Sequence, residues 1–437
     1  MFLQDLRELQ AQGRVIRVGL VGAGQMGEGL VCQCERMGQR MDNRAAGGLQ
    51  VSAMFSRRQS SCESAFASAG ISAVRLCRNE VAAEQAIQQG RRAIVPDLET
   101  LCAIDSLDVI VEATGIPEVG ARTALLAIAN GKHIVQMNVE ADATVGYILR
   151  QKALQAGVIY TLSSGDEPGS IMELYDFART LGFEVICAGK GKNNRVFCHA
   201  TENDPAVQAK AKRFRMNPTM LASFVDGSKT MVEMCSLGNA IGYTPTQRGM
   251  EGHEVTPQSI AQVYCPTEYG GVLRRDKVLD YAYGIAPGVF VVIHVDHPKL
   301  LLDFQYLALG DGPYYALYRP YHLVSLETPL SILRCVLHGQ TSLATEQPPQ
   351  NEALALAKQN LRPGRDLGKV GGENYYGSLD TCANARGLLP LGLAGVARLK
   401  KAVPMDQAIT YEDVELDAES CIVKLRAEQD ALLRSPQ

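Results

Sequence analysis

A glycine-rich turn near the N-terminus limits the possible folds of this chain more than any other feature. It reads Gly22-Ala23-Gly24-Gln25-Met26-Gly27. The apolar run before it, Val15–Val21, is typical of a strand buried on both faces, and Gly24–Met41 is typical of a helix. The spacing Gly-x-Gly-x-x-Gly is weak evidence alone. Between a strand and a helix it indicates the first turn of a doubly wound α/β fold.

The residues after this turn alternate between short apolar runs and stretches rich in helix formers. Strands are predicted at Leu49–Phe55, Leu107–Ala113, His133–Met137 and Val158–Leu162, and helices at Asn79–Gln89, Ala121–Asn130 and Val145–Ala156. Such alternation predicts a parallel sheet with helices between its strands. We therefore expect a Rossmann domain over residues 1–162.

The remaining chain is long enough for one or two further domains, since the total is 437 residues. Residues 163–319 mix helical stretches with alternating strands, which predicts an α+β domain. Thr328–Leu337, within about 320–345, is predicted to be a helix that returns to the first domain. Residues 346–364 are polar and proline-containing, which is typical of a linker. Residues 365–437 are expected to form a small separate module.

Composition and charge exclude several classes of protein. The formal net charge is -4, whereas nucleic-acid-binding proteins usually carry a basic surplus. No apolar run approaches the length of a membrane span, and acidic residues interrupt the N-terminus where a secretory signal would be apolar. The 12 cysteines contain no Cys-x-x-Cys pair. We expect reduced thiols and a cytoplasmic protein.

The glycine turn can bind a diphosphate. Gly22 permits the tight turn, Gly24 lets the backbone approach a pyrophosphate, and Gly27 lets helix and strand pack closely. The anion would rest on backbone N–H groups at the helix N-terminus, which includes Gln25 and Met26. The alternative is a tight turn without a ligand.

The end of the second strand favours NADP(H) over NAD(H). In proteins that bind NAD, an acidic residue at this position usually accepts a hydrogen bond from the ribose 2′-hydroxyl. This chain has Ser56-Arg57-Arg58 instead, and two guanidinium groups suit a 2′-phosphate. More residues separate Gly27 from Arg57 in the sequence than is usual between the motif and this position. We ascribe the additional residues to an insertion at Asp42–Gly48. The alternative is a pair of solvated arginines.

Three more residues are expected near the nicotinamide. Thr114 and Gly115 follow the third strand of the alternating pattern, and Asn138 follows the next one. Carboxyl ends of neighbouring parallel strands border the same crevice. For Asn138 the alternative is a loop cap.

The second domain offers lysines and carboxylates as candidate catalytic groups. Lys190 and Lys192 stand in a glycine-flanked sequence after an apolar strand, and we interpret it as a loop that binds an anion or polarises a carbonyl. A solvated turn is the alternative. Asp226, Lys229 and Glu233 have spacings that can share one helix face. Their alternative is an N-cap, Asp226, followed by a surface ion pair between Lys229 and Glu233.

Two further clusters are less specific. The acidic loop at Asp166 and Glu167 could hold a divalent metal ion through oxygen ligands, but its spacing is not diagnostic. Lys210, Lys212, Arg213 and Arg215 form a basic cluster that is either a solvated helix face or a phosphate clamp.

Several long stretches together resemble the DRL (1-deoxy-D-xylulose-5-phosphate-reductoisomerase-like) oxidoreductases, a homoserine-dehydrogenase-like family. They are Gly131–Asp142, Ala188–Asn194, Ser223–Met234, Gly310–Tyr315 and Tyr318–Leu330. The tail over Leu388–Leu416 resembles a SAF module, the small β-rich unit related to antifreeze proteins and sialate synthases.

The resemblance implies an NADPH-dependent enzyme. Some family members rearrange 1-deoxy-D-xylulose 5-phosphate and reduce the product to 2-C-methyl-D-erythritol 4-phosphate, a step of isoprenoid biosynthesis. It further implies a phosphorylated or polyhydroxy substrate and a homodimer. By comparison with ordinary reductoisomerases it also implies Mg²⁺ or Mn²⁺. Two alternatives stay open: a homoserine-dehydrogenase-like dehydrogenase of another polyol, sugar acid or hydroxy compound, and a cofactor-binding regulatory or sugar-binding protein.

Overall fold

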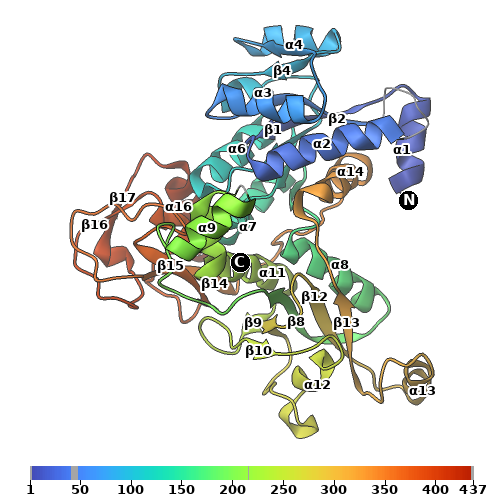
Figure 1. Cartoon of the computed structure of the whole chain (residues 1–437), viewed down its shortest axis with the longest axis vertical. Coiled ribbons are helices and arrows are strands. Elements are labelled where there is room, and N and C mark those ends of the chain that lie inside the picture. Colours follow the sequence, from blue (N-terminus) through green and yellow to red (C-terminus); the bar gives the residue numbers. More distant parts are fainter. Residues whose placement is uncertain (1, 41–47, 215, 435–437) are drawn as a thin grey trace. The chain divides into compact units, whose positions relative to one another are not determined.

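The computed structural model describes residues 2–40, 48–214 and 216–434 (Figure 1). Most of the predicted insertion at 42–48 and Arg215 of the basic cluster therefore lie outside the described residues. The chain folds into two compact units, each built from separate segments. Unit 1 contains Met1–Asp166, Leu323–Glu346 and Glu419–Gln437, and unit 2 contains Glu167–His322 and Gln347–Ala418.

Unit 1 is built on a seven-stranded sheet with the strand order β3-β4-β2-β1-β5-β6-β7. Every neighbouring pair is parallel. Its elements are α1 (Phe2–Ala11), β1 (Ile16–Val21), α2 (Gln25–Arg40), β2 (Leu49–Phe55), α3 (Gln59–Ser68), β3 (Val74–Leu76), α4 (Glu80–Gln88), β4 (Arg92–Ile94), α5 (Leu98–Cys102), β5 (Val109–Glu112), α6 (Pro117–Ala129), β6 (His133–Gln136), α7 (Val139–Gln155), β7 (Tyr160–Leu162), α14 (Thr328–His338) and α16 (Cys421–Arg434). The predicted doubly wound parallel sheet is confirmed.

The order of strands in unit 1 reverses between β1 and β5. From β1 the chain moves to β2 on one side and later to β5 on the other. Because parallel connections are right-handed, the helices of the two halves cover opposite faces of the sheet. The carboxyl ends of β1 and β5 therefore flank a topological switch point, where ligands bind in folds of this type.

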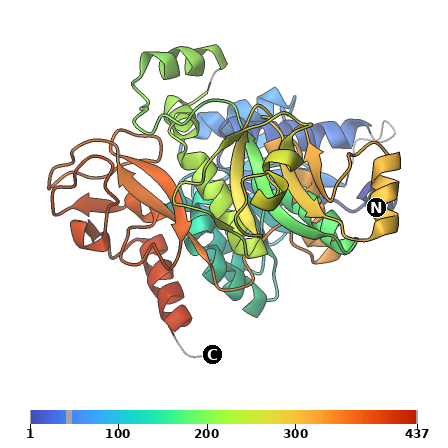
Figure 2. The same cartoon turned by 90° about the horizontal axis from the view of Figure 1, so that it is seen from below.

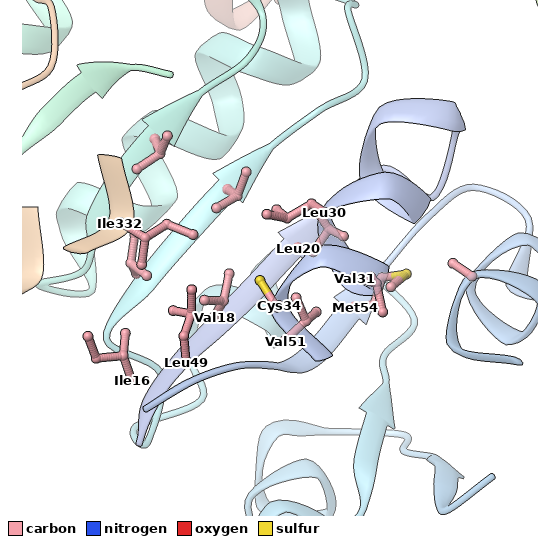
Figure 3. Packing of buried hydrophobic residues seen from close by; sticks show 14 of the residues in the cluster. Ile16, Val18, Leu20, Leu30, Val31, Cys34, Leu49, Val51, Met54 and Ile332 are labelled. Atoms are coloured by element: carbon pink, nitrogen blue, oxygen red, sulfur yellow. The ribbon is translucent and has the colours of Figure 1, made fainter. Parts of the chain in front are cut away.

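Buried aliphatic side chains hold the helices on this sheet (Figure 3). Val18 and Leu20 of β1 contribute to one core cluster with Leu30 of α2 and Ile332 of α14, and all four are at most 1% exposed. Fully burying such a side chain stabilises the fold by roughly 1.5–3 kcal/mol. Helix α14, close to its predicted bounds, thus returns to the sheet although it follows residues 167–322 in the chain.

Four short elements of unit 1 carry little sequence signal and were not predicted: α3, β3, β4 and α5. Strands β3 and β4 have three residues each, too few to show periodicity. They exist because they pair with each other and β4 pairs with β2. Helix α5 begins at a side-chain cap, in which Asp97 Oδ1 accepts from Thr100 N at 2.7 Å.

The C-terminal helix α16 packs on α6 and α7 of unit 1. The carboxylate of Glu118, in α6, accepts from Cys421 N at 2.8 Å and Ile422 N at 2.9 Å at the start of α16. Farther along, Gln429 Oε1 accepts from Ile148 N at 3.1 Å. The predicted module over 365–437 is therefore divided, because its last helix belongs to unit 1.

Unit 2 contains a mixed sheet in the order β10-β11-β8-β12-β13, with β9 also paired to β11. Its elements are α8 (Glu167–Thr180), β8 (Glu184–Lys192), α9 (Pro205–Phe214), α10 (Pro218–Val225), α11 (Ser228–Ile241), β9 (Thr244–Pro245), β10 (His253–Glu254), α12 (Ile260–Val263), β11 (Val278–Tyr283), β12 (Val289–His294), α13 (Pro298–Tyr306), β13 (Tyr314–Arg319), β14 (Asn351–Ala357), β15 (Tyr375–Thr381), α15 (Leu391–Ala394), β16 (Ala397–Leu399) and β17 (Val414–Leu416). The expected α+β character is present.

The prediction of a linker at residues 346–364 is wrong. Residues Asn351–Ala357 form strand β14, all of them buried, which pairs antiparallel with β15 along its whole length. Pro348 and Pro349 precede this strand and Pro363 follows it, so the prolines mark its limits instead of a flexible segment. Residues 347–418 belong to unit 2, and Figure 2 draws them in deep orange to red.

Within the described parts of the chain, no helix is both long and apolar enough to cross a lipid bilayer.

Candidate functional site

The glycine turn of unit 1 joins β1 to α2, and its three glycines have different surroundings. Gly22 has φ +97°, and a Cβ there would lie 3.0 Å from the carbonyl carbon of Ala113. A Cβ on Gly27 would collide with the carbonyl oxygen of Gly22. A Cβ on Gly24 would meet no protein atom within 4 Å. Two glycines thus permit the turn itself, whereas Gly24 faces open space.

That open space lies at the N-terminus of α2. The first helical hydrogen bond runs from Glu28 N to Gly24 O at 2.8 Å. The amide groups of the first helical turn, including those of Gln25 and Met26, have no acceptor within a helix, and the helix dipole favours an anion there. The turn can therefore hold a diphosphate by the contacts that the sequence predicts.

Ser56, Arg57 and Arg58 follow β2 directly, next to the glycine turn in the sheet order because β2 pairs with β1. Arg57 and Arg58 are exposed, and Ser56 is half-buried. Arg58 is the N-cap residue of α3 and makes no side-chain cap bond. Both guanidinium groups can thus reach a ligand from the surface.

Thr114 and Gly115 follow β5 at the other side of the switch point. Thr114 N donates to Glu112 Oε1 at 2.8 Å, and Gly115 has φ +66°. Burial raises the pKa of Glu112 to about 7, although the hydrogen bonds from Thr114 act in the opposite direction. The last residue of β5, Glu112, is therefore a carboxyl group that can be neutral near pH 7. We did not predict Glu112 as a site residue.

Asn138 caps a helix, which agrees with the alternative interpretation of this residue as a loop cap. Its Oδ1 accepts from Ala141 N at 3.1 Å and its Nδ2 donates to Ile116 O at 2.9 Å. The side chain is 0% exposed. Because both amide atoms bind the protein, Asn138 shapes the loop instead of facing a ligand.

In unit 2 the lysine sequence is a strand and not the predicted loop. Strand β8 continues through Lys192 and lies between β11 and β12. Lys190 and Lys192 share one face of it, because successive residues of a strand alternate. A Cβ on Gly189 would lie 2.6 Å from the ring of Phe290, and one on Gly191 2.5 Å from Ala286 N. These glycines make room for packing, so the anion-binding role that we proposed for them is wrong.

Lys190 lies between two carboxylates and is buried. Its Nζ donates to Glu167, at the start of α8, and to Glu233, in α11. Burial opposes the charge of Lys190, but the two carboxylates outweigh it and raise its pKa. Burial raises the pKa of Glu233, and so does the negative charge of Glu167. The sequence did not indicate that Glu167 reaches Lys190.

Lys192 has the opposite character. Burial and the positive charge of Lys190 lower its pKa to about 8, despite the nearby carboxylates. Its Nζ donates to the carbonyl oxygen of Phe224 in α10 at 2.6 Å. Near neutral pH this lysine can therefore both give and take a proton, as general acids and bases do.

Lys229 and Glu233 lie four residues apart on α11, as predicted, but neither is on the surface. Their exposed fractions are 8% and 0%. The surface ion pair that was their alternative is therefore wrong. His322 extends the cluster, since its Nε2 is 3.5 Å from Glu167 Oε1. Lys190, Lys192, Lys229, Glu167 and Glu233 together form what we call the lysine–carboxylate cluster.

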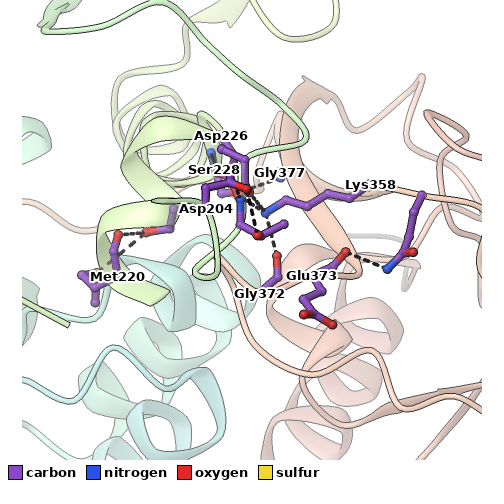
Figure 4. A network of polar contacts seen from close by, with 12 residues as sticks. Asp204, Met220, Asp226, Ser228, Lys358, Gly372, Glu373 and Gly377 are labelled. Carbon is purple, nitrogen blue, oxygen red and sulfur yellow. Dashed lines mark hydrogen bonds and ion pairs between the residues drawn. The ribbon is translucent and has the colours of Figure 1, made fainter. Parts of the chain in front are cut away.

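Asp226 does not belong to this helix face. It caps the C-terminus of α10, and its Oδ1 accepts from Ser228 N at 2.8 Å (Figure 4). Its Oδ2 forms an ion pair of 2.7 Å with Lys358, which follows β14. Burial raises the pKa of Asp226 even beside this lysine. The predicted catalytic role of Asp226 is replaced by a buried structural ion pair.

The basic cluster lies on α9. Lys210, Lys212 and Arg213 are exposed. Lys210 lines a cavity of about 520 Å³, whose other walls include Phe197 and Leu221. Asn194, two residues beyond Lys192, also lines this cavity, so one basic side chain of α9 faces a cavity near the end of β8.

The lysine–carboxylate cluster does not fit a divalent cation as it stands. Within this cluster the oxygen donors are Glu167 and Glu233, and the ammonium group of Lys190 binds both of them. A metal ion would have to displace this buried charge.

Comparison with known proteins agrees with the sequence resemblance. Residues 165–328 match the catalytic domain of oxidoreductase DRL, and residues 22–162 match the NAD-binding domain of homoserine dehydrogenase. The homoserine dehydrogenase of Pseudomonas aeruginosa is 27% identical over 145 residues, which is 33% of this chain and 28% of that protein. The chain thus matches less than a third of that relative's length.

Solved structures of nicotinamide-dependent enzymes resemble the chain more distantly. The 1-deoxy-D-xylulose 5-phosphate reductoisomerase of Zymomonas mobilis, in complex with NADPH, has 15% identity and a TM-score of 0.34, covering 52% of this chain and 58% of that one. An NAD-binding oxidoreductase of Klebsiella pneumoniae has 14% identity and a TM-score of 0.34, covering 71% and 67%. The two matched domains support an oxidoreductase with a DRL-like catalytic domain and a homoserine-dehydrogenase-like NAD-binding domain.

Proposed function

We propose that this oxidoreductase is an NADPH-dependent reductoisomerase of 1-deoxy-D-xylulose 5-phosphate. The observation that carries the proposal is the buried lysine–carboxylate cluster within the stretch that matches the DRL catalytic domain. Rearrangement of a hydroxyketone phosphate followed by hydride transfer needs groups that move protons and polarise a carbonyl. Lysines with different pKa values provide both.

The roles within the cluster follow from its charges. Lys190 is bound by two carboxylates that keep it protonated, so it orders Glu167 and Glu233. Lys192, with a pKa of about 8, is the group that transfers a proton. Lys229 is the candidate that polarises the carbonyl. Lys210 at the cavity beside β8 is the candidate that binds a substrate phosphate.

A second candidate is a metal-independent dehydrogenase of another hydroxy compound. The ion pairs of Lys190 favour it, because they occupy both carboxylates of the lysine–carboxylate cluster, which are then not free to bind a metal ion. Proton transfer by a lysine and hydride transfer to a nicotinamide suffice for that reaction.

One experiment separates these reactions. The full chain is incubated with NADPH and 1-deoxy-D-xylulose 5-phosphate, with and without Mg²⁺ or Mn²⁺, and the products are identified by mass spectrometry and NMR. Formation of 2-C-methyl-D-erythritol 4-phosphate supports the reductoisomerase. No NADPH oxidation at saturating substrate and metal refutes it. Turnover of polyols, sugar acids or homoserine with NADP⁺ then identifies a dehydrogenase, and turnover of any substrate excludes a purely regulatory or sugar-binding protein.

The preference for NADP(H) has its own test. The variant Arg57→Asp/Arg58→Ser removes both guanidinium groups from the expected site of the 2′-phosphate and places a negatively charged carboxylate there. We expect NADPH affinity to fall by about tenfold or more relative to NADH, because charged hydrogen bonds are worth about 1.5–3 kcal/mol each. Calorimetric titration measures both affinities, and Arg78→Ser serves as an exposed-arginine control. An unchanged ratio means that these arginines do not bind the cofactor.

A further inference from the structure

Residues 347–418 of unit 2 hold the start of α11 through buried polar contacts. Lys358 Nζ lies 2.7 Å from Asp226 Oδ2, and it also donates to Ala200 O at 2.6 Å and Gly372 O at 2.7 Å. The side chains of the ion pair are 1% and 0% exposed. In Figure 4 the lysine reaches from the segment after β14 to the loop between α10 and α11.

The same contact continues into the backbone of α11. Asp226 accepts from Ser228 N, the first residue of the helix, and Ser228 Oγ accepts from Gly377 N of β15 at 2.7 Å. A Cβ on Gly377 would lie 2.9 Å from Ser228 Cα, so the strand backbone packs directly on the helix start. Lys358, Asp226 and Ser228 thus form one chain of interactions.

The other end of α11 is fixed by the same hairpin. Asn239 Oδ1 accepts from Gln350 N at 3.0 Å and from Asn351 N at 2.8 Å. Asn351 Nδ2 donates to Tyr243 O at 2.8 Å, just beyond the helix. The β14–β15 hairpin therefore binds α11 at both ends.

We infer that the β14–β15 hairpin is a positioning element of the catalytic machinery, and that Lys358 is a positioning residue acting through Asp226 and Ser228 on Lys229 and Glu233. Lys229 immediately follows Ser228, and Glu233 lies one turn farther along α11. A shift of the helix start thus moves both of them relative to Lys190 on β8. The functional consequence rests on the proposed role of the lysine–carboxylate cluster, whereas the mechanical link does not.

The link is tested without any substrate in the full chain. Lys358→Met removes the ion pair and leaves Asp226 buried without a cationic partner, which favours local opening of the helix start. We expect hydrogen exchange of residues 226–233, and acetylation of Lys229 by acetic anhydride, to be faster than in the wild type by about tenfold or more. Both rates are corrected for any change in the rate of global unfolding. Mass spectrometry of peptides gives both rates.

Three further variants keep the test decisive. Lys358→Arg retains a cation and should restore exchange to within about twofold of the wild type. Ser228→Ala removes the acceptor for Gly377 N and the side-chain hydrogen bond with Asp226 while keeping the ion pair. It should show a smaller acceleration, and it replaces Lys358→Met in the test if that variant does not fold. Arg248→Met removes the 2.7 Å ion pair between Arg248 and Asp380 of β15, which includes no residue of α11, and should leave the reactivity of Lys229 unchanged.

Uniform acceleration across unit 2 in Lys358→Met, or an unchanged Lys229 in both Lys358→Met and Ser228→Ala, overturns the inference. Where an oxidoreductase assay is established, kcat of Lys358→Met should fall by about tenfold while the KM for NADPH changes by less than about twofold. An inactive wild-type chain refutes the proposed reaction alone, because the exchange measurements do not depend on turnover.

Discussion

At the scale of single residues, the unusual feature of unit 2 is a set of buried charges with unequal tendencies to titrate. Lys190 and Lys192 lie on the same face of one strand, yet their pKa values move in opposite directions. The difference arises because Glu167 and Glu233 both bind Lys190, whereas Lys192 donates to a neutral carbonyl oxygen. A buried lysine without a carboxylate partner loses its proton more readily.

We therefore predict that Lys192 titrates near pH 8, more than two units below its usual pKa of 10.5. Below this pH the amine is charged, and above it the neutral amine becomes dominant. The ε-carbon resonance of ¹³C-labelled lysine measures the midpoint, and Lys192→Arg assigns the signal. A midpoint at the ordinary lysine value would contradict the proposed proton transfer.

At the scale of elements, the glycine turn was predictable because its signal is local. The motif, the strand before it and the helix after it are contiguous in sequence, and β1 and α2 lie close to their predicted bounds. Helix α14, predicted at Thr328–Leu337 and observed at Thr328–His338, was predictable for the same reason. Local patterns of this kind specify an element without information from the rest of the chain.

The turn makes a paired prediction about its glycines. Gly24→Ala places a methyl group in open space, so the melting temperature should change little, whereas the affinity for NADPH should fall by about tenfold or more because a diphosphate needs that space. Gly27→Ala collides with the Gly22 carbonyl and should lower the melting temperature clearly. Calorimetry of the two variants, with and without NADPH, compares these effects. Equal melting temperatures would contradict the assignment.

Strand β8 shows why much of the candidate site was not predictable. Its end, Gly189–Lys192, alternates glycine with lysine, a local pattern typical of a polar turn. It forms a central strand because β11 and β12 pair with it and because carboxylates from α8 and α11 neutralise Lys190. These partners are distant in sequence. The partnership of Asp226 with Lys358 is non-local in the same way, so the candidate residues were identified but their roles were not.

At the scale of the whole molecule, the chain does not divide into consecutive domains. The prediction of a C-terminal module over 365–437 treated neighbouring residues as one structure. The fold instead assigns residues 347–418 to unit 2 and the final helix to unit 1. Sequence composition can indicate the returning helix α14, but it cannot indicate which surface a terminal helix will cover.

This arrangement predicts where a C-terminal truncation acts. A chain ending at Ala418 loses α16, so Glu118 loses its partners Ser420, Cys421 and Ile422. Hydrogen exchange should accelerate first in α6 and α7 of unit 1, because α16 packs on them. Glu118→Gln, which weakens the same cap, is the matched point variant. Acceleration confined to residues 365–418 would instead support a separate C-terminal module.

The position of α16 also determines the order in which the protein can be completed during translation. All seven strands of the unit 1 sheet lie before residue 163, so a sheet can begin to form while the ribosome is still making unit 2. The faces of α6 and α7 that α16 covers stay open until residues 421–434 have been made. A nascent chain of this protein therefore carries a seven-stranded sheet whose helices α6 and α7 are not yet covered by α16, so unit 1 can be completed only after unit 2 has been made.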